Sequence, residues 1–207
     1  GINGAIWALI ALDSGNYDMP GNPNAKVQAT REMYINHILE KQTPDGGWAL
    51  SGDVADPDVT GMALQALSKY QDNDKVKPAT EKALHCLSKM QKENGGFSSY
   101  ETENSESCVQ VLVALCELGI SIDDARFVKN GKSVLDNLFT FYDNGKGFRH
   151  IHEDSTNLMA TEQCFYALVA LKRASEGRNT LYDMSDAKHL NVSSDAVGLA
   201  GKNADVK

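Results

Sequence analysis

The sequence has little cysteine, an excess of acidic over basic residues and no long hydrophobic run, and each of these features disfavours a class of protein. Four cysteines in 207 residues form no Cys-x-x-Cys pair, which is unlike a disulfide scaffold or a zinc finger. Twenty Lys and Arg against 28 Asp and Glu give a net charge of −8, which disfavours nucleic acid as a partner. The longest apolar stretch, residues 5–12, is far shorter than the roughly 20 residues of a membrane-spanning helix, so we expect no membrane span.

Strong strand signals are also missing, and an internal repeat takes their place. A glycine turn followed by an aromatic residue occurs three times, with the aromatics at positions 48, 97 and 148, about 50 residues apart. The first two turns begin with glutamine, and the third has none. Glycine suits these turns because it adopts positive φ angles and lets backbones approach closely. The motif residues are Gln42, Gly46, Gly47, Trp48, then Gln91, Gly95, Gly96, Phe97, then Gly147 and Phe148.

Each turn lies between two helical patterns of different kinds. Residues 56–67, 104–115 and 160–171 share an Ala/Leu-rich pattern that is apolar on more than one face, which indicates buried inner helices. Residues 30–41, 79–90 and 134–142 have one apolar stripe each and suit outer helices. Residues 3–12 align with the inner helices, as though their own outer partner were missing and the chain were an excised piece. We expect an all-α domain over residues 1–178 and a linker or arm over residues 179–207.

The glutamine-containing turns resemble the glutamine-tryptophan motif of squalene and hopene cyclases, and the whole array is similar to the prenyltransferase and squalene oxidase repeat. The resemblance spans roughly residues 2–178 and implies an α/α toroid, here a partial barrel of about three and a half helical hairpins. It does not imply one activity, because this fold serves triterpene cyclases, protein prenyltransferase subunits, complement thioester domains and cobalamin carriers. The nearest look-alikes are bacterial cell-surface proteins in which the domain has no assigned reaction.

The segment Asp56-Pro57-Asp58-Val59-Thr60 resembles the Asp-x-Asp-Asp-Thr motif with which such cyclases protonate an alkene. In that interpretation Asp58 is the general acid and Asp56 supports it, although valine replaces the second aspartate of the motif. The alternative interpretation is structural. Asp56 and Asp58 would then cap an inner helix and complement its dipole, with proline in the first turn.

Alignment of the Ala/Leu patterns brings polar residues to equivalent positions at the starts of the inner helices, which predicts an acidic rim at one mouth of the barrel. The rim could bind a cation or a polar ligand, or its carboxylates could serve only to stabilise the helix ends. The predicted ligand-binding positions are Asn3, Asp58, Glu106 and Glu162, with Thr60, Cys108 and Cys164 two residues further along.

Motifs for metal binding and for other kinds of catalysis are incomplete or absent. Glu106-Ser107-Cys108 is the nearest match to the Asp-x-Cys pair of zinc-dependent prenyltransferases, but the next inner helix supplies no histidine, and His150 and His152 lie in the preceding loop. No thioester, nucleotide-binding or nucleophile-elbow motif occurs. We therefore expect no metal and no cofactor. The aromatics Trp7, Tyr17, Trp48, Tyr100, Phe165 and Tyr166 are expected in the core rather than around a ligand.

The leading hypothesis is a non-catalytic binding or scaffolding module of a larger secreted or cell-surface bacterial protein, with a cytoplasmic location as the alternative. Its partners would be neighbouring domains of the same polypeptide and a polar or hydrophobic small molecule. A terpenoid-cyclase-like enzyme that uses Asp58 is the second hypothesis, and a small-molecule carrier similar to the cobalamin binders is the third.

Overall fold

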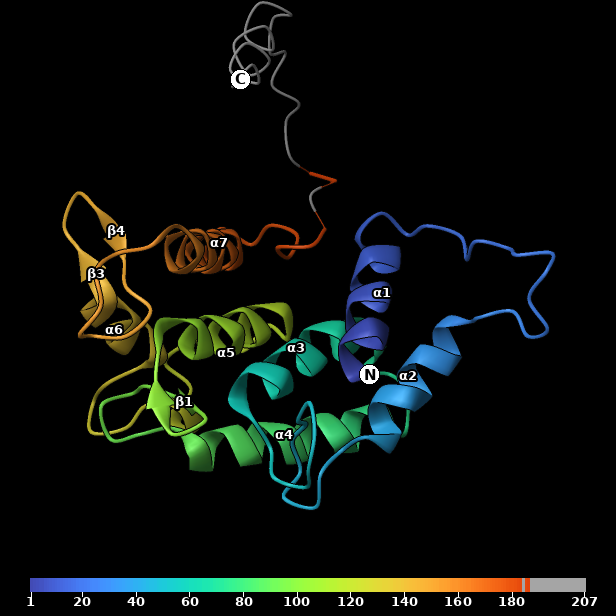
Figure 1. Cartoon of the computed structure of the whole chain (residues 1–207), viewed down its shortest axis with the longest axis horizontal. Helices are drawn as coiled ribbons and strands as arrows, with labels where there is room; N and C mark the ends of the chain where they lie inside the picture. Colours follow the sequence, from blue (N-terminus) through green and yellow to red (C-terminus); the bar gives the residue numbers. More distant parts are fainter. Residues whose placement is uncertain (184, 187–207) are drawn as a thin grey trace, which may run out of the picture.

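A computed structural model of the chain describes residues 1–183, 185 and 186, and the regular secondary structure of this part is almost all helical (Figure 1). The inner helices are α1 (Ile2–Ser14), α3 (Pro57–Leu67), α5 (Ser105–Glu117) and α7 (Leu158–Ser175), and the outer helices are α2 (Arg31–Glu40), α4 (Val76–Met90) and α6 (Val134–Leu138). Single 3₁₀ turns cover Ser68–Tyr70, Ala125–Phe127 and Phe139–Phe141. Two small hairpins pair β1 (Ser98–Ser99) with β2 (Thr102–Glu103), and β3 (Tyr142–Asp143) with β4 (Gly147–Phe148).

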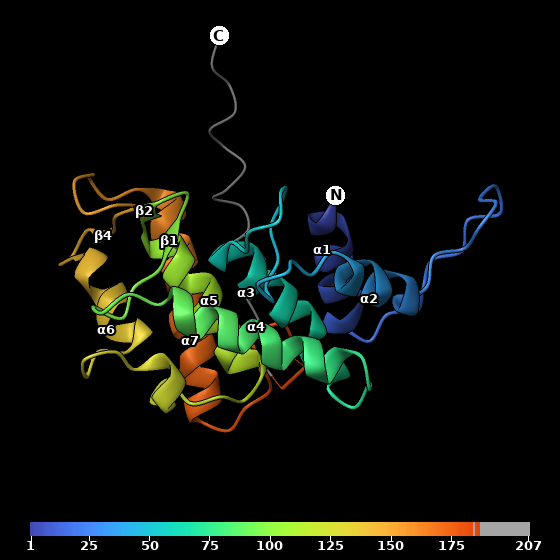
Figure 2. The same ribbon diagram turned by 90° about the horizontal axis from the view of Figure 1, so that it is seen from below.

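The helices alternate between two layers, as the repeat predicts. α1, α3, α5 and α7 pack side by side in chain order, and α2, α4 and α6 pack outside α1, α3 and α5 respectively (Figures 1 and 2). The expected all-α toroid of inner and outer helices is therefore confirmed. α2 packs against α1, the inner helix that precedes it, so each outer helix packs against the preceding inner helix. None of the described helices is long and apolar enough to cross a membrane.

The core lies between the layers and is centred on α5. Eleven of the thirteen residues of α5 are buried, because α3, α7 and α6 surround it. The third outer segment differs from its expected bounds, since α6 ends at Leu138 and a 3₁₀ turn replaces its second half. Strand pairs were not expected either. The β1–β2 pair is a two-residue hairpin whose turn residues, Tyr100 and Glu101, both have positive φ, a conformation that Asn-Gly would signal in a sequence but Tyr-Glu does not.

The glutamines of the repeated motif fasten each turn to the helix layer. Gln42 Nε2 donates hydrogen bonds to the carbonyls of Gly46 and Ala79, both at 2.8 Å. Gln91 Nε2 does the same to Gly95 and Phe127, both at 2.9 Å. One amide group thus closes its own turn and holds the following outer segment. The third turn lacks the glutamine and is built instead as the β3–β4 hairpin.

The motif aromatics fill the space beneath these turns. Trp48 and Phe97 are completely buried, Phe148 is nearly so, and Trp48 Nε1 donates to the carbonyl of Ile38 at 2.7 Å. The glycine before each aromatic is required by close contact, and Gly147 also has a positive φ. A Cβ at Gly47 would lie 2.6 Å from Thr60 Oγ1, and one at Gly147 would lie 2.4 Å from Thr161 Oγ1.

The segment after α7 continues the packed structure beyond residue 178, where the sequence places the domain boundary. Arg173 is buried, and its guanidinium donates to the carbonyls of Asn179 and Asp183 and pairs with Asp186. Tyr182 reaches back across the inner layer to Gln65, to whose Oε1 it donates at 2.9 Å. Described residues up to Asp186 are therefore attached to the toroid, and the rest of the expected arm, residues 187–207, lies outside the described residues.

Candidate functional site at the mouth of the inner helices

A hollow lined mainly by polar residues lies at the N-terminal ends of α3, α5 and α7. It has a volume of about 550 Å³, and we call it the mouth pocket. The β1–β2 hairpin and the loop of residues 149–157 form its other walls, so three inner helices point their positive ends at one place. The lining residues are Asp58, Ser99, Tyr100, Thr102, Asn104, Glu106, His150, Asp154, Asn157, Met159 and Gln163.

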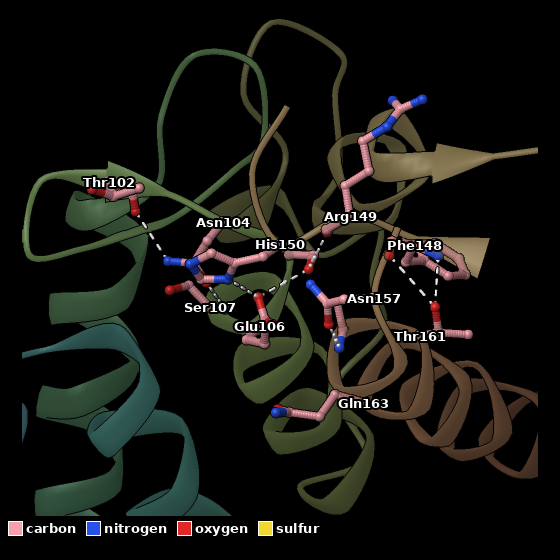
Figure 3. A network of polar contacts seen from close by, with 12 residues as sticks. Thr102, Asn104, Glu106, Ser107, Phe148, Arg149, His150, Asn157, Thr161 and Gln163 are labelled. Carbon is pink, nitrogen blue, oxygen red and sulfur yellow. Dashed lines mark hydrogen bonds and ion pairs between the residues drawn. The ribbon is translucent and has the colours of Figure 1, made fainter. Parts of the chain in front are cut away.

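Glu106 and His150 form the centre of the mouth pocket, where Figure 3 shows them pointing toward one another. His150 Nδ1 lies 2.7 Å from Glu106 Oε2, and the Ser105 hydroxyl donates to the same oxygen at 3.0 Å. The Ser105 backbone N–H donates to the His150 carbonyl at 3.0 Å. The start of α5 therefore holds the 149–157 loop in place, and Glu106 keeps only 12% of its side chain exposed.

Asp58 lies deeper, in the first turn of α3. Its carboxyl has a pKa of about 6, which burial raises most; the hydroxyl of Ser107 and the charge of His150 oppose the shift, and the negative charges of Asp56 and Glu106 add to it. Its Oδ1 is buried and has no hydrogen-bond partner among the described residues. Asp58 is therefore a carboxyl group with unused hydrogen-bonding capacity at the wall of a pocket.

Asp56 has a different role from its neighbour, as the structural interpretation proposes for this residue. Its side chain accepts hydrogen bonds from the backbone N–H groups of Asp58 and Val59, at 2.9 and 3.1 Å, and caps α3. Its other oxygen accepts a hydrogen bond from the Ser99 hydroxyl. Asp56 is a helix cap, whereas no capping hydrogen bond accounts for Asp58.

The structure brings Asp58 and Glu106 together but does not bring Glu162 to them. In α3, the Thr60 hydroxyl accepts from Trp48 N at 2.9 Å and donates to Trp48 O at 3.2 Å. In α7, Thr161 makes the same two hydrogen bonds with the backbone N–H and carbonyl of the third motif aromatic, Phe148. Cys164 is therefore not the counterpart of Thr60, and the sequence alignment of the third repeat is wrong by three residues.

This error has a simple physical origin. Apolar positions on a helix recur every three or four residues, so an alignment based on Ala and Leu can slip by nearly one turn. Counted from the helix caps Asp56 and Asn157, the counterpart of Asp58 is Met159. Met159 lines the mouth pocket, whereas Glu162 is exposed outside it.

The remaining predicted positions do not line the mouth pocket. Thr60 is fully buried, with its hydroxyl occupied by the turn at Trp48. Asn3 is half-buried near the start of α1, and its Oδ1 has no partner among the described residues. Cys108 and Cys164 are both buried, and burial raises the pKa of each thiol to about 12. Both are therefore protonated at neutral pH and ill-suited to bind zinc, which takes thiolates.

In the described part of the chain, no three His, Cys, Asp or Glu side chains are grouped so that they could hold a metal ion.

The expectation that the aromatics lie in the core is wrong for most of them. Trp7, Tyr17, Tyr100 and Phe165 are between 41% and 82% exposed. Tyr100 stands on the wall of the mouth pocket.

Sequence reasoning missed several pocket residues, of which two carried a usable signal. Asn104 and Asn157 cap α5 and α7, accepting from the N–H groups of Ser107 and Ala160 at 2.8 Å, and a search for helix caps would have placed them at the rim. Tyr100, Asp154 and Gln163 gave no such signal, because loop folding and the register of α7 bring them to the mouth pocket.

Deeper along the inner helices a row of hydrogen-bonded polar side chains crosses the layer, and its glutamines Gln65 and Gln110 are buried. Gln65 Nε2 donates to Gln110 Oε1 at 3.0 Å, and Gln110 Nε2 donates to Tyr166 Oη at 2.7 Å and to Gln163 Oε1 at 3.3 Å. With Tyr182 bound to Gln65, this forms a chain of amide and phenol groups across α3, α5 and α7. We call it the amide chain.

The family comparison agrees with this architecture. The family model of the prenyltransferase alpha-alpha toroid domain matches residues 2–129 and 114–194. The chain belongs to this family. The match extends beyond residue 178, in line with the packing of Leu181 and Tyr182 against the core of the toroid domain. A fold shared by unrelated activities does not define the chemistry of a toroid domain, which depends on its own site residues.

Proposed function

We propose that this toroid domain is a non-catalytic binding module whose ligand enters the mouth pocket. The observation that carries the proposal is the pocket of about 550 Å³ with carboxylate, imidazole, amide and phenol groups from three inner helices and two loops. Ligand sites are concave and contain a few well-placed polar groups. We further propose that the module works beside neighbouring domains of a larger exported or cell-surface protein, as its resemblance to bacterial surface proteins suggests.

The amide chain supports binding rather than terpenoid cyclisation. A cyclase shields carbocations with an apolar, aromatic cavity, whereas the inner layer here carries buried Gln65 and Gln110 and half-buried Tyr166 in a hydrogen-bonded row. Neither Trp7 nor Phe165, which could line such a cavity, is among the residues that line the mouth pocket. The enzymatic alternative rests on Asp58, whose raised pKa is what a general acid needs.

Two experiments separate these functions. Nuclear magnetic resonance of labelled protein is titrated with four probes, namely methylammonium, guanidinium, methyl glucoside and inorganic phosphate. The proposal expects at least one probe to shift the backbone amides of Tyr100, Glu106 and Asn157, and not those of loop 15–30. Absence of such shifts with all four probes contradicts it. In parallel, incubation with squalene followed by product analysis should give no cyclic product, and a product that disappears in Asp58→Asn would establish the enzyme instead.

A further inference from the structure

A second hollow adjoins the mouth pocket. It has a volume of about 400 Å³ and lies between the loop of residues 49–57 and the β1–β2 hairpin. We call it the side hollow, and the two together the mouth cleft. Tyr100 lines both parts, with 82% of its surface exposed. The mouth cleft is therefore an elongated depression with an aromatic side chain between its halves.

The charge of the mouth cleft has one sign. Asp58, Glu106 and Asp154 line the mouth pocket, and Asp53 and Glu101 line the side hollow. No lysine or arginine lines either part among the described residues. The only basic group there is His150, which already contacts Glu106. A cationic partner would meet complementary charge along the whole cleft.

Unused hydrogen-bonding groups concentrate at the same end of the molecule. Within the described part of the chain, five buried side-chain oxygens have no partner, and four of them belong to Asn3, Asp58, Ser98 and Ser107. These residues lie at or next to the starts of α1, α3 and α5, and Ser98 lines the side hollow. Ser107 is completely buried, and its hydroxyl faces the Asp58 carboxyl closely enough to lower that group's pKa.

These atoms indicate what the partner must supply. An ionised carboxylate accepts hydrogen bonds and donates none, whereas the Ser98 and Ser107 hydroxyls can also donate, and a buried acceptor without a donor is costly. Of the unpartnered groups, Asp58 lines the mouth pocket and Ser98 the side hollow. A positively charged ligand rich in N–H donors suits these two groups and the carboxylates of the cleft. Guanidinium and ammonium groups also stack favourably on an exposed aromatic ring such as that of Tyr100.

We propose that the mouth cleft binds a short basic peptide segment, with an arginine or lysine side chain in the mouth pocket between Asp58 and Glu106 and the adjoining residues over Tyr100 in the side hollow. An extended peptide suits the two joined hollows better than a compact ion, since the carboxylates are spread over both of them. This inference rests on the proposed binding function and specifies its partner.

The test is fluorescence anisotropy with a labelled Gly-Arg-Gly-Lys-Gly-Arg peptide at 0.15 M salt, and with a control peptide in which Glu replaces each basic residue. We expect saturable binding of the basic peptide and none of the acidic one. The double variant Asp58→Asn/Glu106→Gln should weaken binding at least tenfold, and Tyr100→Ala at least threefold.

Matched controls separate a site from general attraction to an acidic protein. The double variant Glu32→Gln/Asp72→Asn removes the same charge from exposed positions and should change affinity less than twofold. Tyr17→Ala, which removes another exposed tyrosine, should have no effect. Equal losses in the two double variants overturn the inference, as does equal binding of the acidic peptide or failure of the basic one to bind.

The inference and the proposed function fail in different ways. If the basic peptide does not bind but methyl glucoside or phosphate shifts the amides of Tyr100, Glu106 and Asn157, the mouth pocket is a ligand site and only the basic peptide is wrong. If neither the peptide nor any of the four small probes affects these amides, both are wrong. Circular dichroism of each variant verifies that a loss of binding is not a loss of fold.

Discussion

The glycine turns and the mouth cleft both bury polar side chains, but they differ in how far those side chains are hydrogen-bonded. At the turns, Gln42 and Gln91 each place one amide nitrogen between two carbonyls, and of these two amides only the Gln91 Oε1 atom is left buried without a partner among the described residues. At the mouth, Asp58 and Ser107 retain buried oxygens without partners. Satisfied polar groups specify a fold, whereas unsatisfied ones lower stability and are characteristic of sites that meet a ligand. The two regions therefore divide structure from function within one repeat.

The largest effect should come from a turn. Replacing Gln91 with alanine leaves the carbonyls of Gly95 and Phe127 without their buried donor, which should lower the free energy of unfolding by about 3 kcal/mol. Gln42→Ala should cost less, about 2 kcal/mol, because Gln42 is only partly buried. Urea denaturation measures both changes. A loss below about 0.5 kcal/mol for Gln91→Ala would refute the structural role of the motif glutamine.

Replacing Asp58 should stabilise the protein, whereas replacing Gln91 should destabilise it. Its pKa of about 6 in the folded protein lies above its ordinary value of 3.8, so the folded state binds more protons between these values and stability falls as the pH rises from about 4 to 6. Asp58→Asn removes this cost and should raise the free energy of unfolding at pH 7 by about 2 kcal/mol. At pH 3.5 the gain should vanish. Denaturation at the two pH values tests this, and destabilisation at pH 7 would show that Asp58 is structural.

A smaller effect is expected where the mouth pocket meets its loop. His150→Ala removes the contact with Glu106, and because the His150 side chain is 45% exposed, the loss of stability should stay under about 1 kcal/mol. Hydrogen exchange should nevertheless accelerate at Ser105 and Asn157, whose backbone N–H groups donate to His150 and Phe148. If exchange at these two amides is unchanged, the contact does not hold the 149–157 loop.

The smallest effect on stability is expected at an exposed glutamine, which tests whether burial explains the cost expected at Gln91. Gln28 Nε2 also donates to two carbonyls, those of Asn22 and Ala25 at 2.7 and 3.5 Å, but in the exposed loop that projects beyond α1 (Figure 1). Gln28→Ala should therefore change stability by less than about 0.5 kcal/mol. A cost like that of Gln91→Ala would mean that bonding pattern, rather than burial, governs these glutamines.

The repeat could be predicted from sequence because its signals are local. The glycine turns, the helical periodicities of the first two repeats and the cap at Asp56 depend on neighbouring residues, and the structure has helices and a cap at these places. The third repeat was less predictable. Without a glutamine, and with apolar residues on several faces of α7, its register could be set only by the Thr161 contact with Phe148. Glu162 was therefore assigned to the mouth in place of Met159.

The sequence by itself determined the alternation of inner and outer helices, because the helical period of apolar residues is a local feature. It also determined that Asp58 and Glu106 meet, because the spacing of the repeats places both at the starts of neighbouring inner helices. Only the tertiary structure decided which polar groups are satisfied. His150, Tyr100 and Gln163 reach the mouth pocket through loop folding and helix register, and the loss of water that raises the pKa of Asp58 is produced by several elements at once. Burial and hydrogen-bond satisfaction depend on distant neighbours, which no local pattern encodes.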